Sequence, residues 1–161
     1  MRGRGALLLC FLAALVLVVP LAAVARPHDA AVIKTLYNKK LKRKIIVTGA
    51  GLTLYMFTAD TGAMPSCYDD ETYHCALLWH PYRSTDSPVA GPGVNASLLT
   101  TVTRTDGDPQ VMYNRHPLYT ENGRSYSLKA DTKPGQIRGQ GYLQLWWVLS
   151  PQGKPIKKRP R

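Results

Sequence analysis

Acidic residues are scarce in this 161-residue sequence, which has 10 Asp and Glu against 21 Lys and Arg. Only 19% of its residues are charged, so the chain is neither a polyelectrolyte nor a long coiled coil. It also lacks the Gly-x-Ser-x-Gly, His-Glu-x-x-His, phosphate-loop and dinucleotide-binding motifs. These absences argue against the hydrolases, metalloproteases and nucleotide-dependent enzymes that such motifs mark. We therefore expect no enzyme activity and no catalytic residues.

Hydrophobic residues make up 45% of the sequence, which is enough to bury a core. The length suits one globular domain. Short segments rich in β-branched and aromatic residues alternate with Gly, Asp and Asn, the residues typical of turns. The predicted fold class is therefore mainly β, a single small domain of short antiparallel strands.

The N-terminal segment has the pattern of an export signal. Two arginines precede an apolar run over residues 6–19, and a small-x-small cleavage site ends at Ala25. We predict a signal peptide over residues 1–25, cleaved after Ala25, and an extracellular or cell-envelope location. An uncleaved anchor is the alternative, because residues 6–25 are about long enough to cross a bilayer.

The few cysteines are interpreted in the light of export. Cys10 would leave with the signal peptide, and it lacks the preceding small residue that lipidation requires. Cys67 and Cys75 remain, and because disulfides persist in exported proteins we predict one bridge between them. A redox pair or a thiolate metal site is the alternative, although neither has its usual C-x-x-C spacing here.

Positive charge is concentrated at both ends of the exported chain. Residues 26–44 carry a net charge of +6 and residues 154–161 carry +5, whereas residues 45–153 total −2. We divide the exported chain accordingly into a basic N-terminal segment, a β domain and a basic C-terminal tail. The basic segments predict attraction to anionic envelope polymers or a lipid surface, with solvated tails that bind nothing as the alternative. No specific nucleic-acid partner is expected, and the oligomeric state stays open.

Turn residues divide the β domain into short strands. Residues 44–48 and 52–57 flank a Gly-Ala-Gly turn and predict a hairpin. An Asp-Gly pair and an Asn-Arg turn separate three further segments, which predict a three-stranded meander: residues 99–105, 110–113 and 116–119.

The remaining segments are less regular. Residues 143–149 are the most apolar strand of the exported chain and are predicted to be central, and residues 125–128 predict a short strand. One N-terminal helix is predicted over residues 29–41, from apolar residues at helical spacing, and a short helical turn over residues 75–79. Residues 83–93, rich in Ser, Pro and Gly, predict a loop.

A weak internal repeat relates residues 54–61 to residues 125–132. Each copy has a tyrosine five residues before an aspartate, Asp60 in the first copy and Asp131 in the second. Asp60 would fall past the end of its strand, where Asp commonly caps a turn. Such repetition is consistent with duplicated supersecondary units.

An ordered series of motifs resembles one family. Tyr55, Phe57 and Asp60 satisfy the signature Tyr-x-(Phe/Trp/Tyr)-x-x-Asp, which resembles the bacterial secreted repeat family of exported proteins and lipoproteins. Similarity to the family covers about residues 46–153, with four more segments: residues 75–81 around Trp79, residues 111–119, residues 131–141, and residues 146–153, which begin with Trp146 and Trp147.

The resemblance implies an exported protein of unknown function. Members are often lipid-anchored, and a part in envelope redox or electron transfer has been suggested for some. This sequence departs from the family pattern in its wider cysteine spacing, in Arg115 and His116, and in an insertion over residues 121–125. The aromatic side chains of the motifs are predicted to form core and not a ligand platform.

Sulfur and imidazole side chains cluster around the two cysteines. Met64, His74 and His80 would be the remaining ligands once the thiols are bridged, and such ligands suit copper or haem iron. No cofactor is expected, with copper or haem held by these three residues as the alternative. Residues 69–71 are acidic but lack the spacing of a calcium loop, and we interpret them as a solvated loop tip.

The sequence thus predicts an exported cell-envelope or secreted protein that acts as a non-catalytic binding or accessory module. The alternative is an envelope protein of redox, electron-transfer or metal-handling function. Such a protein must hold a metal or a chromophore.

Overall fold

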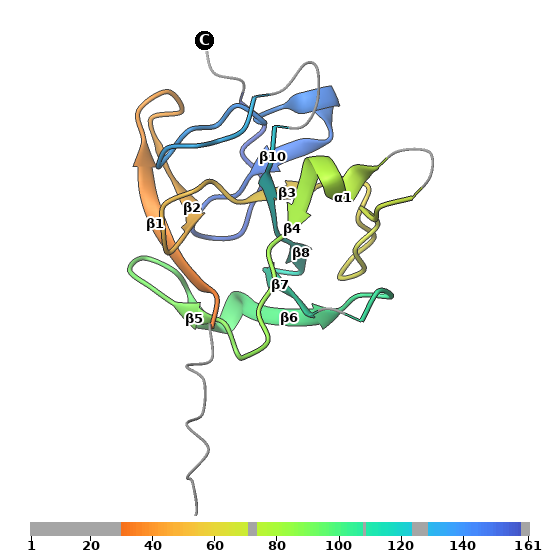
Figure 1. Ribbon diagram of the computed structural model, residues 1–161. Coiled ribbons are helices and arrows are strands. Elements are labelled where there is room, and N and C mark those ends of the chain that lie inside the picture. Colours follow the sequence, from red (N-terminus) through yellow and green to blue (C-terminus); the bar gives the residue numbers. More distant parts are fainter. Residues whose placement is uncertain (1–29, 71–73, 108, 124–128, 159–161) are drawn as a thin grey trace, which may run out of the picture.

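The computed structural model describes residues 30–70, 74–107, 109–123 and 129–158 (Figure 1). The predicted signal peptide, Cys10, the cleavage site after Ala25 and the strand over residues 125–128 lie outside these residues. The elements are β1 (Val32–Asn38), β2 (Arg43–Thr48), β3 (Tyr55–Phe57), α1 (Cys75–Leu78), β4 (Trp79–Pro81), β5 (Val89–Ala90), η1 (Ala96–Leu98), β6 (Leu99–Thr103), β7 (Pro109–Tyr113), β8 (His116–Pro117), β9 (Tyr119–Glu121), η2 (Tyr142–Gln144) and β10 (Trp146–Val148).

Three small sheets make up the described fold, which confirms the mainly β prediction. Their strand orders are β2-β1-β5, β10-β3-β9-β4 and β6-β7-β8. Strand pairing is antiparallel throughout these sheets except between β1 and β5. In the part of the chain that the structure describes, no helix is long and apolar enough to cross a membrane.

The helix predicted over residues 29–41 is wrong, because this segment forms β1 and the turn that follows it. β1 pairs with β2 from Ile33 opposite Thr48 to Asn38 opposite Arg43. The segment contains several β-branched residues, which favour a strand, and Ile33 is fully buried. Asn38 closes the turn, since its side-chain oxygen accepts a hydrogen bond from the Leu41 amide at 2.8 Å.

The meander predicted from the Asp-Gly and Asn-Arg turns is confirmed by β6, β7 and β8. The hairpin predicted around the Gly-Ala-Gly turn is only partly formed: a single bridge joins Val47 to Thr53, after which β3 leaves to pair with β10 and β9. The predicted helical turn near residue 75 is α1.

The prediction that the strand near residues 143–149 is central is wrong. This strand, β10, lies at one edge of its four-stranded sheet. Its side chains are nevertheless all buried, because they alternate between two core clusters. Trp146 and Val148 belong to the first cluster, whereas Trp147 belongs to the second. Burial on both sides, and not a central place in the sheet, explains the apolar sequence of this strand.

Candidate functional site

The motif residue Tyr55 is buried and bonded to an aspartate from the second half of the chain. Its hydroxyl donates to Asp131 Oδ2 at 2.5 Å and accepts the Gly139 amide at 3.2 Å. Burial, followed by the nearby Asp131 carboxylate, raises the pKa of Tyr55 well above its ordinary value. The phenol therefore keeps its proton and acts as a donor. Burial likewise raises the pKa of Asp131.

The motif residue Asp60 is held in a similar way by a tyrosine from the second half. Asp60 Oδ1 accepts hydrogen bonds from the Tyr119 hydroxyl at 3.3 Å, the Ser66 amide at 2.8 Å and the Ser66 hydroxyl at 3.0 Å. Asp60 thus caps the loop that leads to Ser66. Its other oxygen, Oδ2, is buried and has no hydrogen-bond partner. Burial raises the pKa of Asp60 to about 6.

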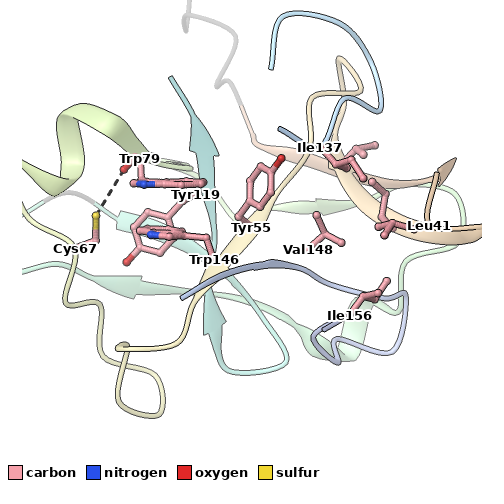
Figure 2. Close-up of a cluster of buried hydrophobic side chains, with 11 residues drawn as sticks. Leu41, Tyr55, Cys67, Trp79, Tyr119, Ile137, Trp146, Val148 and Ile156 are labelled. Atoms are coloured by element: carbon pink, nitrogen blue, oxygen red, sulfur yellow. Dashed lines mark hydrogen bonds between the residues drawn. The ribbon is translucent and has the colours of Figure 1, made fainter. Parts of the chain in front are cut away.

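Trp79 and Trp146 form a stack in the first core cluster, toward the side where Cys67 lies (Figure 2). The rings of Trp79 and Trp146 are nearly parallel, with centroids 3.8 Å apart. Phe57 stacks on Trp146 at 4.3 Å. Tyr55 meets Trp79 edge-on at 5.3 Å, and Tyr119 meets Trp146 edge-on at 5.2 Å. Trp79 and Trp146 are at most 2% exposed, so the stack is core and offers no platform to a ligand.

These contacts follow an approximate two-fold pattern. The motif strands β3 and β9 pair at Tyr55 opposite Tyr119. β10, from the end of the chain, pairs with β3, whereas β4, from the first half, pairs with β9. Leu145 and Leu78, which directly precede Trp146 and Trp79, accept matching backbone hydrogen bonds. Leu145 O accepts the Thr58 amide and Leu78 O accepts the Asn122 amide, both at 2.9 Å. Each half of the chain thus supplies the outer strand of the other half.

The two-fold pattern revises the internal repeat. Asp60 and Asp131 are counterparts, as the sequence comparison indicated, but Tyr119 is the structural counterpart of Tyr55. Tyr126, the counterpart predicted from sequence, lies outside the described residues. The Leu-Tyr pairs ending at Tyr55 and Tyr119 carry the signal that could have found this correspondence.

Cys67 and Cys75 form the predicted disulfide, with their Cα atoms 5.2 Å apart. Arg104 anchors the loop that they close: its guanidinium donates to Cys67 O at 2.9 Å and to Gln110 Oε1 at 2.8 Å, and it lies 4.1 Å from the centre of the Tyr68 ring. Arg104 is 2% exposed. Its Nε also donates to both carboxylate oxygens of Asp106, at 3.2 and 3.1 Å. Sequence reasoning missed Arg104, although Asp106 two positions further on was a signal that could have marked it.

The three candidate metal ligands have separate surroundings. His74 Nδ1 lies 3.0 Å from Asp69 Oδ1, and His80 Nε2 lies 2.8 Å from Asn122 Nδ2. Met64 is 55% exposed. Among the described residues, no group of three or more His, Cys, Asp or Glu side chains could hold a metal ion.

Exposed cations from three distant segments gather at one end of the fold. Leu41, Ile137 and Ile156 pack into the same core cluster, and all three lie at one side of it in Figure 2. Asn38 Nδ2 donates to Gly135 O at 2.9 Å, and Gln140 Nε2 donates to Ile156 O at 2.6 Å, so the segments are joined directly. The neighbouring cations are exposed, and we call them the basic end: Lys39, Lys40, Lys42, Arg43, Lys44, Arg138, Lys157 and Lys158.

A groove of about 550 Å³ opens at the basic end. Residues 36–40 form one wall and residues 134–138 form the other. Neither segment contains an acidic residue, whereas Lys39, Lys40 and Arg138 bring three cations to the groove.

Comparison with known proteins finds a family match in one part of the chain, residues 100–150. Residues 100–150 match the model of a family described as a secreted repeat of unknown function. This confirms the resemblance to that family, for the motif segments that lie within residues 100–150, and the description agrees with export. No curated protein and no solved structure matches the chain.

Proposed function

Because residues 100–150 carry a secreted repeat, we propose that this protein is an exported binding module that attaches to anionic material of the cell envelope. The basic end would make the attachment. The signal peptide, removed after Ala25, would deliver the chain to that compartment. This is a non-catalytic role, in which the fold presents a charged surface.

The basic end carries the proposal. Its eight cations are exposed, and the three segments that contribute them, residues 38–44, 135–138 and 156–158, contain no acidic residue. Charges of one sign that share a surface attract a polyanion more strongly than the same charges scattered over the molecule. In an exported protein, the polyanions within reach are acidic polymers and lipid headgroups of the envelope.

The motif residues support a structural part for the rest of the fold. Tyr55 and Asp131 are bonded to each other inside the core, and Tyr119 and Asp60 form the second such contact. The stacked tryptophans are equally buried. The signature residues thus stabilise the scaffold that holds the basic end, and we assign the binding role to the surface.

Retention on an anionic surface tests the proposal. The exported protein should bind carboxylated beads at about 0.05 M salt and elute well below about 0.5 M, because salt screens exposed charges. The double variant K40Q/K157Q removes two cations of the basic end and should elute at lower salt.

The matched control is R115Q/K154Q, which removes two exposed cations beside the turn where Asn114 donates to Gly153 O. It should elute close to the unmodified protein. Elution that does not depend on salt, or equal shifts for the two double variants, would contradict attachment through the basic end.

A further inference from the structure

The groove at the basic end has the shape and chemistry of a ligand site. We propose that it binds a segment of an acidic polysaccharide, a chain of sugar rings that carry carboxylates. This inference rests on the proposed function and names the ligand class and the site. The proposed function needs only the charge of the basic end, whereas here the groove itself recognises the ligand by its shape and its lining residues.

The walls of the groove are fixed before any ligand arrives. Asn38 is 4% exposed and uses both ends of its amide: Nδ2 donates to Gly135 O at 2.9 Å, and Oδ1 accepts the Leu41 amide at 2.8 Å. Gly135 has a φ of +70°, and a Cβ built there would lie 2.8 Å from Leu36 Cδ2. The two walls are therefore packed and bonded together, which lowers the entropy cost of binding.

The charges of the groove suit carboxylates. Lys39 and Lys40 lie on one wall, and Arg138 lies on the other. The Arg138 guanidinium is held by a hydrogen bond from Nη1 to Ala130 O at 2.8 Å, so its orientation is constrained. A guanidinium and two ammonium groups carried by residues that line one groove can pair with carboxylates on successive sugars.

The uncharged lining suits sugar rings. Tyr37 lines the groove and is 56% exposed, so its ring is accessible to a ligand. Leu36 and Pro134 add apolar surface beside it. The C–H faces of a sugar ring pack against such surfaces, while its hydroxyls stay in water. A ring-free polyanion would use the cations but gain nothing from Tyr37.

The concave shape of the groove favours a polysaccharide over a lipid bilayer as its ligand. A volume of about 550 Å³ between two walls lies within the range of sites for small ligands, and a flat lipid surface does not enter such a groove. A polysaccharide segment one or two sugars long would fill it.

The experiment measures Kd for three polymers at one ionic strength, with the exported full chain. The polymers are polygalacturonate oligomers, which carry one carboxylate per sugar, poly-L-glutamate of equal charge, and neutral dextran. Vesicles with anionic lipid form a fourth arm. We expect polygalacturonate to bind most tightly of the four.

Two triple variants separate the groove from general charge. K39Q/K40Q/R138Q removes the groove cations, whereas K42Q/K44Q/K157Q removes three exposed cations of the basic end that do not line the groove. The first should weaken polygalacturonate binding about tenfold and the second at most about threefold, because only the first removes direct pairing with carboxylates. Thermal unfolding shows whether both variants stay folded.

Substitution of Tyr37 tests whether the sugar rings of the ligand pack against its side chain. Y37A should weaken polygalacturonate binding several-fold and leave poly-L-glutamate binding unchanged, while Y37F should bind both like the unmodified protein. Equal losses in the two triple variants, an unaffected Y37A, or tighter binding to vesicles than to polygalacturonate would overturn the polysaccharide site while the proposed function stands. No binding to any of the anionic probes would overturn both.

Discussion

Asp60 should make the protein less stable as the pH rises through about 6. Burial raises its pKa from an ordinary 3.8 to about 6 in the folded protein. A raised folded pKa means that the folded state holds the proton more tightly than the unfolded state does. The stabilisation is therefore complete below pH 3.8 and is lost as the pH passes the folded value. At about 1.4 kcal/mol for each unit between the two pKa values, the loss is about 3 kcal/mol.

The variant D60N, which cannot ionise, isolates this effect. Urea unfolding followed by tryptophan fluorescence would give the free energy of unfolding from pH 4 to pH 8 for both proteins. Constant differences, such as an altered bond to Ser66, cancel in the comparison of the two profiles. Between pH 4 and pH 8, the variant should gain about 2.5 kcal/mol relative to the unmodified protein, because part of the effect falls below pH 4.

The comparison variant is D70N, which replaces an exposed carboxylate and shows how much of the profile change comes from the loss of a surface charge. Parallel profiles for D60N and the unmodified protein would refute the reasoning. They would show that the buried Asp60 carboxylate costs no more free energy than an exposed one.

Three further predictions concern the core. Reduction of the bridge between Cys67 and Cys75 should lower the free energy of unfolding by about 2 to 3 kcal/mol, and an unchanged urea midpoint in reductant would contradict this. G139A should cost about 1 to 3 kcal/mol in thermal unfolding, because the new Cβ would lie 2.5 Å from Trp79 Cη2; an unchanged Tm would show that the ring moves freely. W146A should cost about 3 to 5 kcal/mol in urea unfolding, and a loss below about 1 kcal/mol would mean that the stack contributes little.

Short sequence patterns predicted those parts of the fold in which neighbouring strands follow one another directly along the chain. The meander of β6, β7 and β8 follows from two short turns. The Asn-Arg turn gives the observed register, with Tyr113 opposite His116, whereas at the Asp-Gly turn Thr103 lies opposite Pro109, one position away from the register of a two-residue loop. β1 was missed because Ala30, Ile33, Tyr37 and Leu41 fall at helical spacing. Pairing with β2 decides the outcome, and Tyr37 is exposed although the helix required it on the buried face.

The site was predictable only in part. The cysteine pair and the concentration of charge at both ends can be read from the sequence. The groove cannot, since it depends on a hydrogen bond between Asn38 and Gly135, 97 positions apart. The bond from Arg104 to Cys67 O and the Tyr119–Asp60 contact also join distant segments. Sequence patterns report what each segment does alone, whereas these contacts arise when distant segments pack together.

The exchange of outer strands between the halves has a consequence for how such a chain could have arisen. A single half would expose the strand edge that β10 or β4 covers, and it would leave one tryptophan of the stacked pair without its partner. A second copy of the same half would supply both, through a symmetric dimer of the kind that most soluble oligomers form. Fusion of two such copies in one gene would then need no new interface, only a linker. The strand pairing in this single polypeptide is therefore the pairing expected between the two subunits of a symmetric dimer.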